Sequence, residues 1–181
     1  EFFLEGRGNF DFAPGGGGGG GTPTVFFSRR IGLEGGQIVP ITAGGRMTGK
    51  VGPFDLGVLN MQTGDEATSG AASTNFTVVR VKRDILRRSS VGGIFTNRSV
   101  SLVDDGNSQV YGVDGRFAFY DDFTLMGYFA NTRTPARNGR DNSYQGRFDY
   151  AGDRYGLSYD HLVVEDRFIP EVGFIPRENF R

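Results

Sequence analysis

Acidic residues that sit next to arginines are the first candidates for chemistry in this sequence. Asp84, Asp114, Asp149 and Asp153 each lie within two residues of an arginine. Hydrolysis of a glycosidic bond would need two carboxylates held about 5–10 Å apart and free to act as acid and base. We expect these carboxylates instead to balance arginines on a charged surface. The acidic residues therefore predict no catalytic pair.

The other reactive side chains are isolated. His161 is the only histidine, and because a catalytic or metal-binding histidine usually needs partners, we expect it to pack at a strand end. No Gly-x-Ser-x-Gly motif supports a serine nucleophile. The acidic stretches at 65–70 and 103–107 lack the spaced ligands of a calcium-binding loop. We expect no catalytic residue, no metal site and no cofactor.

Cations gather in two short stretches, FFSRR at 26–30 and VKRDILRR at 81–88. In one interpretation, Arg29 and Arg30 dock the N-terminal segment against acidic residues elsewhere in the fold. In the other, the arginines form a weak site for anionic sugars or phosphate groups, which guanidinium groups recognise well. The sequence favours neither interpretation.

Composition excludes several classes of protein. The chain has 181 residues, 20 basic and 21 acidic, with a net charge of −1, so nucleic acid is not an expected partner. It contains no cysteine, and no apolar run approaches the roughly 18 residues of a membrane-spanning helix. The chain begins with glutamate and shows no signal peptide, so we expect a processed or excised part of a longer protein.

Glycine and aromatic residues are abundant, with 30 glycines, 17 phenylalanines and 7 tyrosines, which favours an all-β fold. Residues 1–40 look irregular and include the run Gly15–Gly21, which we interpret as a flexible tether, a loop or part of a plug. Residues 41–181 are predicted to form an antiparallel β meander. The predicted strands are 41–51, 54–63, 75–86, 90–99, 109–120, 123–133, 143–151 and 154–164, with a ninth near 168–175.

The predicted connections alternate in length. Short turns fall at Gly52–Pro53, Arg87–Ser89, Asp121–Asp122 and Gly152–Asp153, whereas longer polar loops cover 64–74, 100–108 and 134–142. Short turns at one end and long loops at the other are typical of an up-and-down outer-membrane barrel.

The strands alternate between apolar and charged residues, as expected when a sheet has one face in an apolar medium. A turn at Asp121–Asp122 predicts Phe119 opposite Thr124, Phe117 opposite Met126 and Gly115 opposite Tyr128. The expected lipid-facing residues are Met47, Val51, Val79, Val81, Val113, Phe117, Phe119, Met126, Tyr128, Phe148, Tyr150, Tyr155, Leu157 and Tyr159. The expected lumen-facing charges are Arg46, Lys50, Arg80, Lys82, Asp84, Asp114, Arg116, Arg147 and Asp149.

Several blocks of sequence resemble one bacterial protein family. They are EFFLEG (1–6), VFFSRRIG (25–32), ITAGGRMTGKVGPFDLGVLNMQT (41–63), NFTVVRVKRDILRRSSVGGIFTNR (75–98), VYGVDGRFAFYDDFTLMGY (110–128), GDRYGLSYDHL (152–162) and FIPEVGFIPRENFR (168–181). The chain is similar to the uncharacterised domain that follows a family-9-type carbohydrate-binding domain in predicted outer-membrane proteins. The blocks cover nearly the whole chain.

This resemblance implies a longer protein with a signal peptide, a carbohydrate-binding domain and a barrel-like region with more strands. It implies no enzymatic activity and no catalytic residue, and because the binding domain is absent, no glycan-binding residue can be transferred. The expected fold is an outer-membrane-type β-barrel, or part of one, with about eight or more strands.

The expected function is a non-enzymatic anchor or port of a glycan-handling protein in the bacterial outer membrane. Its partners would be outer-membrane lipid, and a glycan or anionic polysaccharide bound through the absent domain or an arginine-rich patch. One alternative is a soluble β-sheet binding or assembly module, secreted or periplasmic, and another is the accessory region of a glycoside hydrolase.

Overall fold

The computed structural model describes residues 7–13, 21–67, 70–136 and 139–175. Within these ranges the protein is all-β: a two-stranded sheet, an eight-stranded antiparallel sheet and short 3-10 turns, with no α-helix. The glycine run, apart from Gly21, lies outside the described residues.

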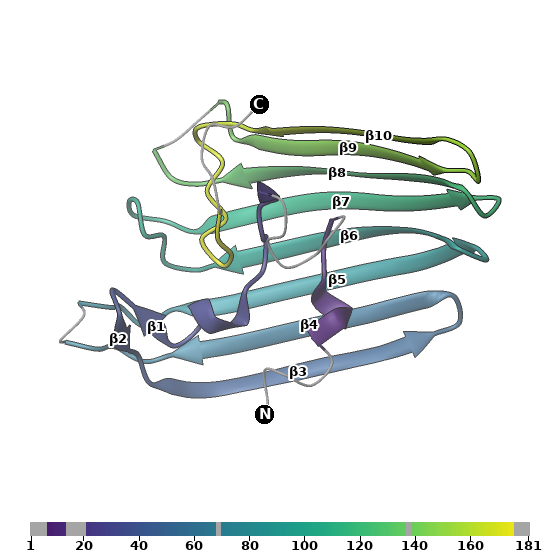
Figure 1. The fold of residues 1–181 in the computed structure, drawn as a ribbon. Coiled ribbons are helices and arrows are strands. Elements are labelled where there is room, and N and C mark those ends of the chain that lie inside the picture. Colours follow the sequence, from purple (N-terminus) through teal and green to yellow (C-terminus); the bar gives the residue numbers. More distant parts are fainter. Residues whose placement is uncertain (1–6, 14–20, 68–69, 137–138, 176–181) are drawn as a thin grey trace.

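The large sheet is a meander in which every strand pairs with its neighbour in sequence, in the order β3 to β10 (Figure 1). The prediction of eight consecutive antiparallel strands is confirmed, and four of them have the predicted bounds. The strands are β3 (Ile41–Val51), β4 (Phe54–Thr63), β5 (Asn75–Leu86), β6 (Ser89–Arg98), β7 (Ser108–Phe119), β8 (Phe123–Arg133), β9 (Asn142–Ala151) and β10 (Gly156–Val164).

The predicted ninth strand is wrong. Residues 168–175 form turns and irregular chain, with one isolated bridge from Phe174 to Thr24. A small hairpin of β1 (Leu33–Glu34) and β2 (Gln37–Ile38) lies within the first forty residues, which were predicted to be irregular.

Short and long connections lie at opposite ends of the sheet, as the sequence predicts. The turns at 52–53, 87–88, 120–122 and 152–155 lie together at one end, and the loops that follow β4, β6 and β8 lie at the other (Figure 1). We refer to these as the short-turn end and the long-loop end.

The turn between β7 and β8 contains three residues instead of two. Phe119 pairs with Phe123, and Tyr120 takes a positive φ of 55° to make the turn. Because side chains alternate with period two, a shift of one residue moves every side chain of a strand to the opposite face. The predicted register of this hairpin, and with it the predicted orientation of β8, is therefore wrong.

One face of the large sheet is covered by chain from both terminal regions (Figure 1). The covering segments are residues 7–13, 21–31 and 165–175, which include η1 (Arg7–Phe10) and η3 (Ser28–Arg30). Backbone hydrogen bonds between Thr24 and Phe174 join the N-terminal and C-terminal segments. We call the covered face the inner face and the opposite one the outer face.

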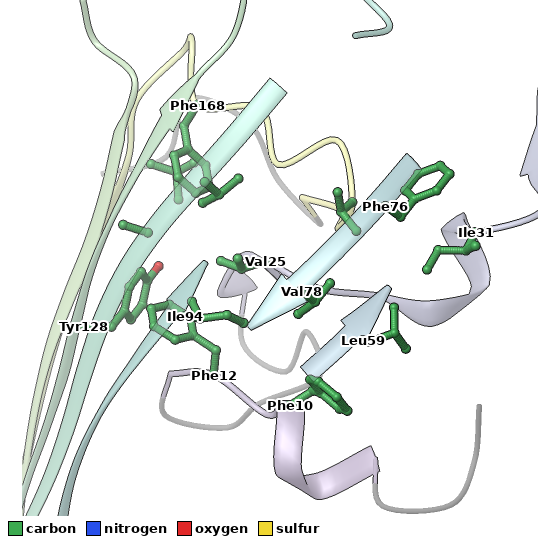
Figure 2. Close-up of a cluster of buried hydrophobic side chains, with 14 of the residues drawn as sticks. Phe10, Phe12, Val25, Ile31, Leu59, Phe76, Val78, Ile94, Tyr128 and Phe168 are labelled. Atoms are coloured by element: carbon green, nitrogen blue, oxygen red, sulfur yellow. The ribbon is translucent and has the colours of Figure 1, made fainter. Parts of the chain in front are cut away.

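The hydrophobic core lies between the inner face and these segments (Figure 2). Phe10 and Phe12 reach the sheet from the N-terminal segment, and Phe168 and Val172 from the C-terminal segment, and all four are buried. Phe12 packs edge-on against Tyr128, with ring centroids 5.6 Å apart. The sheet depends on the two segments for its core.

Strands β3 and β10 form the two edges of the sheet that the described residues make. No pairing joins them within this part of the chain, so the sheet is open. Each edge strand presents a row of unpaired backbone groups, a feature that natural sheets usually cover or pair.

Candidate functional site: a charged inner face and an apolar outer face

Charged side chains are confined almost entirely to the inner face. The register assigns twelve of the fourteen charged residues in β3 to β10 to this face. The two exceptions are Arg83, toward the short-turn end of the sheet, and Arg133, at the long-loop end. The inner-face charges are Arg46, Lys50, Asp55, Arg80, Lys82, Asp84, Arg98, Asp114, Arg116, Arg147, Asp149 and Asp160.

All nine predicted lumen-facing charges are among these twelve, so the structure places them together on one face. Asp55, Arg98 and Asp160, which are not among the nine, complete the set. The sequence does contain the information that assigns them. Once the strand pairing is known, the alternation of side chains places each of the three on the same face as the predicted charges.

The outer face carries exposed apolar side chains across its width. Val113 in the middle of the sheet is 59% exposed, and Met47 and Leu157 on the edge strands are 65% and 62% exposed. Large exposed apolar patches on a protein usually mark contact with another apolar medium or partner. The predicted lipid-facing residues on this face are Met47, Val51, Val79, Val81, Val113, Phe117, Phe119, Phe148, Tyr150, Leu157 and Tyr159.

Two predicted members of this set lie on the opposite face. Met126 pairs with Arg116 and Arg147, and Tyr128 pairs with Asp114 and is buried in the core. Both assignments are wrong because the three-residue turn reverses β8. Their outer-face places are taken by Phe123, Leu125 and Phe129. Tyr155 precedes β10 and lies in the exposed turn that leads into it.

Amide side chains form a belt on the outer face at the long-loop end. The Asn60 amide donates hydrogen bonds to Asn75 and Thr77, and the Gln109 amide donates one to Asn97. On β8, Arg133 ends the strand with its guanidinium over the Tyr111 ring. The apolar part of the outer face thus ends at a polar boundary.

A buried ion pair holds the N-terminal segment against the inner face. The Arg80 guanidinium donates two hydrogen bonds to the Asp114 carboxylate, at 2.6 and 2.8 Å, and their side chains are 2% and 17% exposed. The Arg80 Nε also donates to the Asp11 carbonyl, and the Ala13 amide donates to Asp114. The pair therefore binds the segment through its backbone.

Glycines in the strands leave room for the segment's aromatic rings. A Cβ atom at Gly57 would lie 3.0 Å from the Phe10 ring, and one at Gly112 would lie 2.6 Å from the Phe12 ring. Such distances are shorter than ordinary van der Waals contacts, so a side chain at either position would displace a ring. These two glycines form sockets for Phe10 and Phe12.

A second buried cation ties the C-terminal segment to the sheet. Arg98 donates a hydrogen bond to Glu34 at 2.8 Å and lies 3.8 Å from the Glu171 carboxylate. Glu171 is itself buried and accepts hydrogen bonds from the Ser101 hydroxyl and the Leu102 amide. The buried charges are paired, as charges in a protein interior must be.

More exposed ion pairs join other inner-face charges at the short-turn end. Lys50 lies 3.1 Å from Asp84 and 3.5 Å from Asp55, and Arg147 lies 2.7 Å from Asp149. The expectation that these acidic residues balance arginines is confirmed for Asp114 and Asp149, whereas Asp84 pairs with Lys50.

The other predicted functional residues lie apart from this arrangement. Arg29 and Arg30 are exposed, and among the described residues no ion pair links them to an acid. The docking role that one of the two interpretations gave them is filled by Arg80. His161 lies on the outer face opposite Gly146, with its ring 6.4 Å from that of Tyr144.

Within the described ranges, no three acidic, histidine or cysteine side chains come together to hold a metal ion. No helix in this part of the chain is long and apolar enough to span a membrane. The chain matches no protein-family model, no curated protein and no solved structure, so its two-faced sheet carries the functional argument alone.

Proposed function

We propose that residues 41–164 form part of an outer-membrane β-barrel whose outer face contacts lipid and whose inner face lines a filled lumen. The observation that carries the proposal is the separation of charge, with twelve of fourteen charged strand residues on one face. A soluble two-faced sheet would gain nothing from exposing the apolar face, because burial of such surface is favourable by about 25 cal/mol per Å².

The dimensions of the outer face support this proposal. On β7 the apolar stretch runs from Tyr111 to Phe119, which is eight residue steps or about 27 Å along the strand. If the strand is tilted by about 40° from the membrane normal, this stretch covers roughly 21 Å along the normal. That is close to the height of the apolar band, about 25 Å, in outer-membrane barrels. Arg133 pairs with Gln109 just outside this stretch, where a long cationic side chain can reach polar groups, whereas Arg83 lies level with Gly115 through Val91.

A barrel closed by these eight strands alone would be too narrow. An eight-stranded barrel has an interior that side chains fill, whereas this inner face carries the backbone of three segments, 7–13, 21–31 and 165–175. We therefore propose that β3 and β10 pair with further strands in a wider barrel. With chain packed over the inner face, the role of an anchor is favoured over that of an open port.

Membrane fractionation with a pair of arginine substitutions tests the proposal. Val113 and Gln109 share a strand and a face, but Val113 lies within the apolar band and Gln109 in the amide belt. Arginine on the lipid-facing side costs about 2–4 kcal/mol near the middle of the membrane and about 0–1 kcal/mol at its edge. We expect to recover the wild type in the carbonate-washed membrane pellet. In lipid vesicles, we expect Val113→Arg to reduce the fraction of folded protein far more than Gln109→Arg does.

Recovery of the wild-type protein in the soluble fraction would refute the membrane assignment. Equal tolerance of the two arginines would do the same, because an exposed valine in water accepts arginine with little loss of stability. Either result would favour the soluble β-sheet module, with the outer face as a surface for a protein partner.

A further inference from the structure

The outer face is hollowed by a groove of about 810 Å³ across its middle strands. Gly115, Gly127 and Gly146 lie directly opposite one another on β7, β8 and β9 and line its floor, with the Phe117 ring reaching over Gly115. Val113 and Phe129 stand on one side of this row, and Phe117 and Leu125 on the other. The groove is therefore a trough that crosses the strands between two apolar walls.

The trough has a cation at one end. The row of the three glycines continues through Val91 to Arg83 on β5. The exposed Arg83 guanidinium lies 5.2 Å from the centroid of the Phe54 ring, and no acidic group among the described residues pairs with it. Arg83 lines the groove, so a ligand in the trough would meet this positive charge.

We propose that this groove binds one anionic diacyl phospholipid, with its phosphate at Arg83 and an acyl chain over the three glycines. From Arg83 to Gly146 the row crosses four strand spacings, about 19 Å. That length is comparable to one leaflet of hydrocarbon, which is half of the roughly 30 Å core. In strands tilted by about 45°, a row across the strands is also inclined to the membrane normal and can follow a chain into the leaflet.

A second hollow supports a ligand with two chains. It has a volume of about 520 Å³ and shares Val81, Gly93, Val113 and Phe129 with the groove. The two hollows therefore adjoin along these four shared residues, and each is lined mainly by apolar side chains. Arg83 supplies the selectivity, because a guanidinium recognises a phosphate through paired, charge-assisted hydrogen bonds.

The test measures phospholipid retained by the detergent-purified protein with native mass spectrometry, using added phosphatidylglycerol and phosphatidylcholine. Wild type should retain phosphatidylglycerol, and Arg83→Gln should bind it about tenfold more weakly, the loss expected for one charge-assisted contact. Arg133→Gln is the matched control, since Arg133 is the other outer-face arginine and lies outside both hollows. An equal loss in Arg133→Gln would overturn the proposal.

A glycine substitution tests the trough itself. A Cβ atom at Gly146 would have nothing within 4 Å, so Gly146→Leu fills the groove without moving the backbone. Gly49 is equally open but lies on β3, outside both hollows, so Gly49→Leu is the control. We expect only Gly146→Leu to lose phosphatidylglycerol. Retention of lipid by Gly146→Leu, or equal loss in Gly49→Leu, would overturn the assignment.

The inference rests on the proposed function, but the two can fail separately. If wild type stays in the soluble fraction after cell lysis, the membrane proposal fails. If wild type is recovered in the carbonate-washed pellet yet retains no phosphatidylglycerol after purification, only the lipid site fails.

Discussion

Removing one partner of the buried pair Arg80–Asp114 should release the N-terminal segment from the sheet. In Asp114→Ala the Arg80 guanidinium, 2% exposed, would keep its charge with only the Asp11 carbonyl as an acceptor. Breaking a buried ion pair by truncating one partner destabilises a protein by about 3–5 kcal/mol. The variant would also lose the hydrogen bond from the Ala13 amide. We therefore expect a loss of at least about 3 kcal/mol in the free energy of unfolding.

The assay is urea unfolding of the protein in detergent or vesicles, followed by Tyr fluorescence, together with limited proteolysis near residue 11. Asp84→Ala is the control, because Asp84 pairs with Lys50 at an exposed position and should lose little or no stability. The double variant Arg80→Met, Asp114→Leu should recover most of the stability, since it leaves no buried charge unpaired. If Asp114→Ala is no worse than Asp84→Ala, the pair is not buried and the segment is not docked through it.

Two further predictions concern the contacts between the terminal segments and the inner face. Phe12→Ala should destabilise the protein by about 3–5 kcal/mol in urea unfolding, because the ring is buried against Tyr128. The control Leu86→Ala, at an exposed site, should change stability by less than about 1 kcal/mol. Similar losses in the two variants would place Phe12 outside the core. Gly173→Ala should destabilise the protein by about 1–3 kcal/mol, since a Cβ atom there would overlap the backbone of Thr24 and Val25. The control Gly146→Ala meets open space and should melt close to wild type. A wild-type melting temperature for Gly173→Ala would show that the N-terminal and C-terminal segments are not in contact.

The sequence was sufficient to predict the strands and the side on which charges gather. Period-two alternation is strong in 41–51 and 75–86, and the predicted bounds of both strands match those of β3 and β5. Even Arg80 and Asp114, on strands separated by β6, could be assigned to one face before their contact was known. These predictions succeed because they depend only on local pattern.

The errors arise where a single backbone conformation or a distant contact decides the outcome. Tyr120 adopts a positive φ, uncommon for a large residue, and this extra turn residue reversed the predicted orientation of β8. Gly57 and Gly112 resemble any other strand glycines in sequence, and only the docked rings identify them as sockets. The packing of residues 7–13 and 21–31 also depends on partners far along the chain, so local composition suggested only an irregular segment.

The sockets also constrain the order in which the protein can fold. Phe10 needs Gly57 on β4, Phe12 needs Gly112 on β7, and the Thr22 hydroxyl donates a hydrogen bond to Gln145 on β9. Phe10, Phe12 and Thr22 therefore find their complete binding surface only after strands β4 to β9 have paired. Contacts between residues so distant in sequence form slowly, because the loops that they close are long. The N-terminal segment must remain unburied while the sheet assembles, and its docking is a late step that reports completion of the meander.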